Sequence, residues 1–303
     1  MTNEQRLKNL QMPTHPVDVV LDTDAYNEVD DQYAISYLLA CGEKLRLQAF
    51  YAAPFYKKHL DSVKQGMEES YREICDLLKL AKREATVLRG SETFMIDEKT
   101  PVVSEAARDL AERALRYSPE MPLYVIAIGA ITNVASAILL EPKVAENTVV
   151  IWLGGHAHHY HDTLEFNLRQ DIAAARVVMG SGVPLVQLPC NGVVSSFRIS
   201  KPELEHWFVG KSELMSYLAG YTIKTADSYA AGKPWTRVIW DVTAVAWLVN
   251  EESRFMLSRI ENVRLPDYDG KYEQPIDIPM SYVYHIQRDA LMEELVQRIH
   301  SLK

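Results

Sequence analysis

A cluster of acidic residues near the start of the chain constrains the fold more than any other feature. Five carboxylates lie within ten residues, from Asp22 to Asp31, directly after the largely apolar run Val17–Leu21, which has the pattern of a strand. Like charges at this density repel one another, so a folded protein tolerates them most easily around a hard cation or where chemistry requires them. The sequence therefore predicts a functional site at the end of this strand.

The composition predicts a globular protein that binds neither nucleic acid nor membranes. The chain has 303 residues, of which 48% are hydrophobic, and a formal net charge of −9. An acidic surface of this kind disfavours nucleic-acid backbones and anionic lipids. No apolar run approaches the roughly 18 residues of a membrane-spanning helix. Residues 1–15 lack the apolar core of a secretory signal and the three cysteines lie far apart, so we expect a cytoplasmic protein with reduced thiols.

Strand-like and helix-like segments alternate along the chain. Apolar runs predict strands at residues 17–21, 45–53, 123–128, 148–153, 184–188 and 280–286. The stretches between them have helical patterns, most clearly residues 57–82, where apolar side chains recur every three or four positions. Such alternation predicts an α/β fold with a mostly parallel central sheet and helices on both faces, that is, a Rossmann-like core. Because no linker or repeat interrupts the pattern, we expect a single domain over residues 1–303.

Three kinds of site could explain the acidic segment. An EF-hand loop beginning at Asp22 would need Gly at its sixth position and Glu at its twelfth, where this chain has Asn27 and Tyr33. A phosphoryl-transfer loop of the haloacid dehalogenase type explains the first two aspartates and leaves the last two unused. In a cation site, Asp24 after the strand and Asp31 at the start of the next helix would bind one ion, and all-oxygen ligands favour calcium or magnesium. Helix capping alone explains two aspartates but not five carboxylates.

Four motifs resemble those of the inosine-uridine-preferring nucleoside hydrolase family. In chain order they are Asp22-Thr23-Asp24 with Asp30-Asp31, then Ile126-Ala127-Ile128-Gly129-Ala130-Ile131-Thr132-Asn133, then Glu165-Phe166-Asn167 with Asp171, and last Asp241-Val242-Thr243-Ala244-Val245-Ala246. Each motif is weak by itself, but together they cover about residues 17–250 in the order and at the separations of the family. The resemblance implies the fold and the ion site of these hydrolases.

The resemblance also implies an activity and the residues that perform it. The protein would be a calcium-dependent hydrolase of the N-glycosidic bond of ribonucleosides or related ribosides. Asp24, Asp31 and Asp241 would bind Ca2+ through their side chains, and Ile128 would bind it through its main-chain carbonyl. Asp24 would in addition be the general base for the calcium-bound water. The reaction would pass through an oxocarbenium-like transition state, which nearby carboxylates stabilise.

Further residues are implied to bind the substrate. Asp30 would accept a hydrogen bond from a ribose hydroxyl, with the catalytic base as its second possible role, and Glu165 and Asn167 would bind other ribose hydroxyls. Asp22 would orient the metal-binding residues. Because the family is commonly oligomeric, we expect a homodimer or homotetramer that acts on a small-molecule riboside, as in purine or pyrimidine salvage.

The chain departs from the family pattern on the side of the leaving group. Trp240 stands immediately before Asp241, where many members have a histidine; an indole can stack on a flat base but cannot usefully donate a proton. Residues 156–161 hold four histidines, which could supply a replacement acid, bind a transition metal or form an exposed loop without chemistry. We therefore expect ribose recognition to be kept and base specificity to have changed. The alternative is a non-catalytic nucleoside- or pentose-binding protein that retains the ion site.

Overall fold

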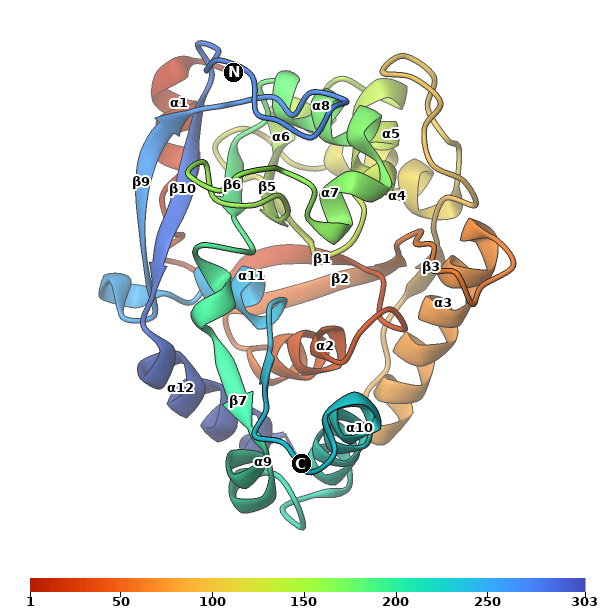
Figure 1. Ribbon diagram of the computed structural model, residues 1–303. Helices are drawn as coiled ribbons and strands as arrows, with labels where there is room; N and C mark the ends of the chain where they lie inside the picture. The colour runs from red at the N-terminus through yellow and green to blue at the C-terminus, as the bar shows by residue number, and fades with distance from the viewer. Residues whose placement is uncertain (303) are drawn as a thin grey trace.

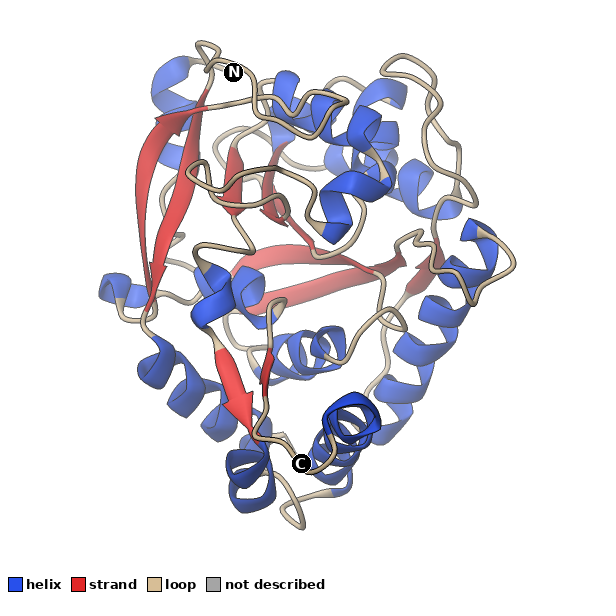
Figure 2. Cartoon of the chain, in the orientation of Figure 1, coloured by secondary structure: helices blue, strands red, loops and turns tan. Residues whose placement is uncertain are grey.

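An eight-stranded sheet organises the chain (Figures 1 and 2). The computed structural model describes residues 1–302. The strands follow one another across the sheet as β3 (Val87–Arg89), β2 (Leu45–Ala52), β1 (Val17–Thr23), β4 (Leu123–Ala127), β5 (Thr148–Leu153), β6 (Leu185–Leu188), β10 (Pro279–Ile286) and β9 (Met256–Asn262). Neighbouring strands are parallel except for β10 and β9, which pair antiparallel.

Helices cover both faces of this sheet. In Figure 1, α2 and α12 lie below β1 and β2, and α5 and α8 lie above them. The core is divided accordingly, because Val19 and Leu21 of β1 belong to one buried cluster and Val20 to the other. The first face is covered by α2 (Asp30–Ala40), α3 (Val63–Leu80), α11 (Val242–Trp247) and α12 (Arg288–Ser301), and the second by α4 (Glu105–Ala114), α5 (Thr132–Leu140), α6 (Val144–Asn147) and α8 (Ile172–Gly180).

The remaining elements lie outside these layers. A two-stranded antiparallel sheet, β7 (Arg198–Ser200) with β8 (Thr236–Val238), flanks the helices α9 (Lys201–Trp207) and α10 (Glu213–Ala230). The short elements are α1 (Asn3–Asn9), α7 (Phe166–Gln170), η1 (Val194–Ser196) and η2 (Glu251–Ser253). Within residues 1–302, none of the helices has the length and apolar character needed to cross a bilayer.

The predicted fold class is confirmed, including the mostly parallel sheet and the helices on both faces. The central strands were predictable because β4, β5 and β6 are buried along their whole length, so their sequences are predominantly apolar. The prediction that residues 201–250 are mostly helical missed β8, a three-residue strand that begins two residues after Pro234. The edge strand β9 was also missed, since four of its seven residues are exposed and their pattern is mixed.

The topology places the carboxyl ends of the central strands together. In the register between β1 and β4, Asp22 pairs with Ala127, so these two strands end at nearly the same level. In open parallel sheets, ligands bind in the crevice beyond these ends. The loops after β1, β4 and β5 therefore meet where the sequence predicts the site.

Candidate active site

A pocket of about 380 Å³ lies beyond the carboxyl ends of the central strands. Its lining comes from the acidic loop (residues 22–31), the ends of β4 and β5, and the starts of α7 and α11. Nearly every predicted site residue is among the lining residues, namely Asp24, Asp30, Asp31, Ile128, Glu165, Asn167, Trp240 and Asp241. Asp22 is the exception, because it does not reach the pocket surface.

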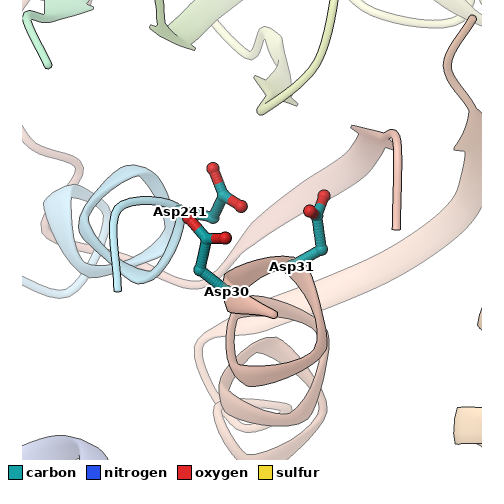
Figure 3. A group of neighbouring side chains, drawn as sticks. All are labelled: Asp30, Asp31 and Asp241. Atoms are coloured by element: carbon teal, nitrogen blue, oxygen red, sulfur yellow. The ribbon is translucent and has the colours of Figure 1, made fainter. Parts of the chain in front are cut away.

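Three carboxylates converge in this pocket (Figure 3). Asp30 and Asp31 occupy the first turn of α2, and Asp241 precedes the first residue of α11. One oxygen from each side chain lies within 4.8 Å of the others, and all three residues are buried. Both helices direct their positive N-terminal ends at this point, which favours negative charge there. Asp30 was predicted to bind a ribose hydroxyl. Its carboxylate lies in the same cluster as those of Asp31 and Asp241, which were predicted to bind the ion.

Asp24 approaches the same region from the end of β1. Its side chain is buried, and among residues 1–302 its Oδ2 atom has no hydrogen-bond partner. The loop after β4 lies directly against it, because a Cβ added at Gly129 would be 3.3 Å from Asp24 Cγ and 2.9 Å from Ala53 Cβ. Only a residue without a side chain allows this approach of the two loops.

Burial and mutual repulsion raise the pKa values of these carboxyls. Burial, followed by the charge of Glu28, raises the pKa of Asp30 to about 6. The pKa values of Asp24, Asp31 and Asp241 lie well above the ordinary range, first because of burial and then because of the neighbouring carboxylates. Oδ1 of Asp30 is a second buried oxygen without a partner among the described residues. These two unpartnered oxygens, together with the clustered carboxylates of Asp30, Asp31 and Asp241, are donors of the kind that a hard divalent cation needs, so these residues fit such an ion.

Polar side chains behind the pocket hold the acidic loop in place. The Thr23 hydroxyl donates a hydrogen bond to Asp31 Oδ1 at 2.5 Å. Asn133 on α5 donates to Asp22 Oδ1 at 2.7 Å, and burial raises the pKa of Asp22 to about 7 despite this hydrogen bond. Asp22 therefore lies behind the residues that were predicted to bind the ion.

Glu165 and Asn167 line the pocket, and their side chains also hold the backbone around it in place. The Glu165 carboxylate caps α7 and accepts three buried backbone N–H groups, those of Asn167 at 2.8 Å and of Leu168 and Gly155 at 3.0 Å. Asn167 Nδ2 donates to the carbonyl oxygens of Ile128 at 3.2 Å and Leu153 at 3.0 Å. Asn167 thus fixes the carbonyl that was predicted to bind the ion. Sequence reasoning missed this role because the two residues are 39 positions apart.

The pocket also has basic residues at its edge that the sequence analysis did not single out. Arg237 lines the pocket and forms an ion pair with Glu28 of the acidic loop. The Lys57 ammonium lies 3.7 Å from the same carboxylate. Arg169, four residues after Glu165, lines the pocket as well. Because these three basic residues come from three separate segments, no local pattern could have predicted their grouping.

The four clustered histidines lie in different surroundings. His156 lines the pocket, where its Nδ1 accepts a hydrogen bond from the Asn191 N–H at 3.3 Å, and burial lowers its pKa. The His158 ring stacks on Tyr282, with ring centroids 4.4 Å apart. His161 is exposed over 76% of its side chain. Within residues 1–302 these histidines join no metal-binding group, so the transition-metal interpretation has no support.

The fold is that of solved nucleoside hydrolases. The plant nucleoside hydrolase PpNRh1 superposes with a TM-score of 0.74 at 18% identity, over 94% of this chain and 99% of that one. The purine-preferring ribonucleoside hydrolase from Gardnerella vaginalis gives 0.73, also at 18% identity, over 94% and 98% of the two chains. The family model for inosine-uridine preferring nucleoside hydrolases matches residues 19–280, so this chain belongs to that family.

Similarity to curated relatives is local. The pyrimidine-specific ribonucleoside hydrolase RihB of Shigella flexneri serotype 5b (strain 8401) is 29% identical over 137 residues, which are 42% of this chain and 42% of that protein. The match to a relative from Shigella boydii serotype 4 (strain Sb227) covers 54% of that protein. The chain therefore spans about half the length of the curated relatives it matches. The resemblance seen in the sequence motifs is confirmed at the level of the family.

Proposed function

We propose that the protein is a calcium-dependent hydrolase of the N-glycosidic bond of ribonucleosides or related ribosides. The main observation that supports this proposal is the grouping of Asp30, Asp31 and Asp241, with Asp24 in the same pocket, at the carboxyl ends of the strands. Membership of the nucleoside hydrolase family supports the proposal. The relatives are named for pyrimidine and for purine substrates, so they leave the base preference open.

The donor set suits a hard, oxygen-preferring divalent cation, for which we propose calcium. Asp24, Asp31, Asp241 and the Ile128 carbonyl would hold the ion, with Asp30 adjacent, and these are oxygen donors throughout. The hydrogen bond from Asn167 uses one of the two lone pairs of that carbonyl, which leaves the other for a cation. When bound, a divalent cation would polarise the attacking water and hold the ribose 2′- and 3′-hydroxyls.

Asp24 is proposed to take the proton from that water. The oxygen then bonds to C1′ of the ribose, the C1′–N bond breaks, and its electron pair leaves with the base. The Asp24 carboxylate is buried and lines the pocket, where it would act as the general base for this step. The ring of carboxylates stabilises the positive charge that develops on the sugar. Trp240, which lines the pocket, would stack on the departing base.

Asp30, Glu165 and Asn167 are proposed to orient the sugar. A ribonucleoside has three free ribose hydroxyls. With the 2′- and 3′-hydroxyls at the ion and Asp30, the 5′-hydroxyl remains for Glu165 and Asn167. Because Asn167 Nδ2 is engaged by two backbone carbonyls, its Oδ1 is the atom left to accept from that hydroxyl.

Release of reducing sugar from inosine, uridine, adenosine and cytidine tests the proposal. We expect release from at least one of them in calcium, and a loss of about 10²–10⁴-fold in Asp24→Asn, the range of a general base. Asn keeps an oxygen donor but cannot take the proton. Binding of ribose without release from any nucleoside would instead favour a binding protein. The proposed homodimer or homotetramer is checked separately by light scattering.

A further inference from the structure

An arginine that forms no ion pair within residues 1–302 lines the acidic pocket. Arg169 lines the pocket, and its guanidinium carbon lies 5.3 Å from the centroid of the Phe166 ring. Within residues 1–302, no carboxylate lies within ion-pair distance of this exposed guanidinium. Lys57 lies 5.5 Å from the same ring centroid, but it is occupied by Glu28 at 3.7 Å and by the Asn27 carbonyl at 2.7 Å. Arg169 is therefore the free cation on this side of the described pocket lining.

The position of Arg169 defines the part of the substrate that it meets. Its backbone N–H donates to the Glu165 carbonyl at 2.9 Å, so the two residues are one helical turn apart, and residues at this spacing share a face. Glu165 and Asn167 are the residues proposed above to receive the ribose 5′-hydroxyl. A group attached to O5′ would then extend from Glu165 towards Arg169.

The chemistry of the two ends of the pocket indicates what that group is. Inside lie the carboxylates of Asp24, Asp30, Asp31, Glu165 and Asp241, which repel an anionic substituent unless a cation compensates nearby. A neutral nucleoside makes no use of a guanidinium at this place. The planar guanidinium over an aromatic ring has its N–H groups free at the edge, and it matches two oxygens of a phosphate.

We propose that Arg169 binds a phosphate on O5′ of the riboside, so that the preferred substrate is a ribonucleoside 5′-phosphate rather than the free nucleoside. This inference rests on the proposed function, because it uses the ribose orientation assigned there. Two other roles compete with it. Arg169 could offset the charge of Glu165 without touching substrate, or it could bind an acidic group on the base.

Matched substrates and variants separate these roles. We would measure kcat/KM in calcium for uridine and its 5′-monophosphate, for inosine and its 5′-monophosphate, and for orotidine, which carries a carboxylate on the base. The wild-type enzyme should favour the monophosphate about tenfold or more in at least one pair. Arg169→Gln should abolish most of this preference, whereas Arg169→Lys should keep part of it. Arg108→Gln, an equal charge change at an exposed site on α4, is the control and should keep the preference in full.

Each other result has a definite meaning. If the nucleosides are hydrolysed but the monophosphates are no better, or if Arg169→Gln lowers kcat/KM equally for both, the phosphate site is wrong while the proposed hydrolase stands. A preference for orotidine without a gain from the 5′-phosphate places the anion on the base and overturns the O5′ assignment. If nothing is hydrolysed, the proposed function fails. Calorimetric binding of ribose 5-phosphate and of ribose then decides the role of Arg169, which must favour the phosphate in wild type and not in Arg169→Gln.

Discussion

Replacing Glu165 with Ala should destabilise the protein, because its carboxylate joins the loop after β5 to the start of α7. The carboxylate accepts three buried N–H groups, two from the first turn of α7 and one from Gly155 in the loop after β5. A buried donor that loses its partner costs about 1–3 kcal/mol. At about 1 kcal/mol for each of the three, the loss is about 3 kcal/mol.

This loss converts into a shift of the melting temperature. The unfolding entropy is about 2.1 cal/mol/K per residue, which for 303 residues gives about 0.6 kcal/mol/K. The melting temperature of Glu165→Ala should therefore fall by about 5 °C. Circular dichroism melts of wild type, Glu165→Ala and Glu165→Gln measure it. Gln keeps one acceptor oxygen, so its shift should be about half as large.

The control variant makes the reasoning refutable. If Glu165→Ala melts within about 1 °C of wild type, the three hydrogen bonds do not hold the wall of the pocket together. If Glu165→Gln melts together with the wild type, the acceptor role is also wrong, because Gln has lost one of the two oxygens that accept these N–H groups.

Three further predictions follow from the same structure. Chelation with EDTA should lower the melting temperature by about 4 °C relative to protein in calcium at 100 times its Kd, since a ligand at that concentration stabilises the folded state by about 2.7 kcal/mol. An unchanged melting temperature in differential scanning fluorimetry would contradict the proposed ion site. Calcium affinity should fall as the pH is lowered from about 8 to 5.5, because the raised pKa values of the carboxyl ligands, and of the adjacent Asp30 at about 6, let protons compete with the cation; affinity independent of pH in calorimetric titrations would contradict the carboxylate site. Gly66→Ala should destabilise the protein, because the added Cβ would lie 2.2 Å from the Phe55 carbonyl oxygen, and the cost of this clash should exceed the roughly 1 kcal/mol by which Ala favours a helix over Gly. A variant that resists urea better than wild type would show that the contact relaxes freely.

The ion site could be predicted from the sequence because most of its parts are local. Asp24 and Asp31 are only seven residues apart and flank a strand-to-helix turn, so their convergence follows from the order of the elements. The tight grouping with Asp30 could not be predicted in the same way. It depends on the angle at which α2 leaves the loop and on the packing of α11 against α2, which brings Asp241 beside it.

The edge of the pocket could not be predicted, because its contacts join distant segments. The ion pair of Arg237 with Glu28 spans 209 positions, and the hydrogen bond from Asn167 to the Ile128 carbonyl spans 39. In the sequence, none of these residues belongs to a local pattern that indicates its partner. Only the packed sheet and its loops show that they face one cavity.

Calorimetric titration of calcium into chelator-treated protein tests the central claim most directly. We predict one ion per chain, with affinity reduced at least about tenfold in Asp241→Asn, because the loss of one charged oxygen ligand removes at least about 1.4 kcal/mol. Asp97→Asn, which changes an exposed loop carboxylate, should bind calcium as the wild type does. No saturable binding in the wild type, or equal affinity in Asp241→Asn, would contradict a cation held by these carboxylates.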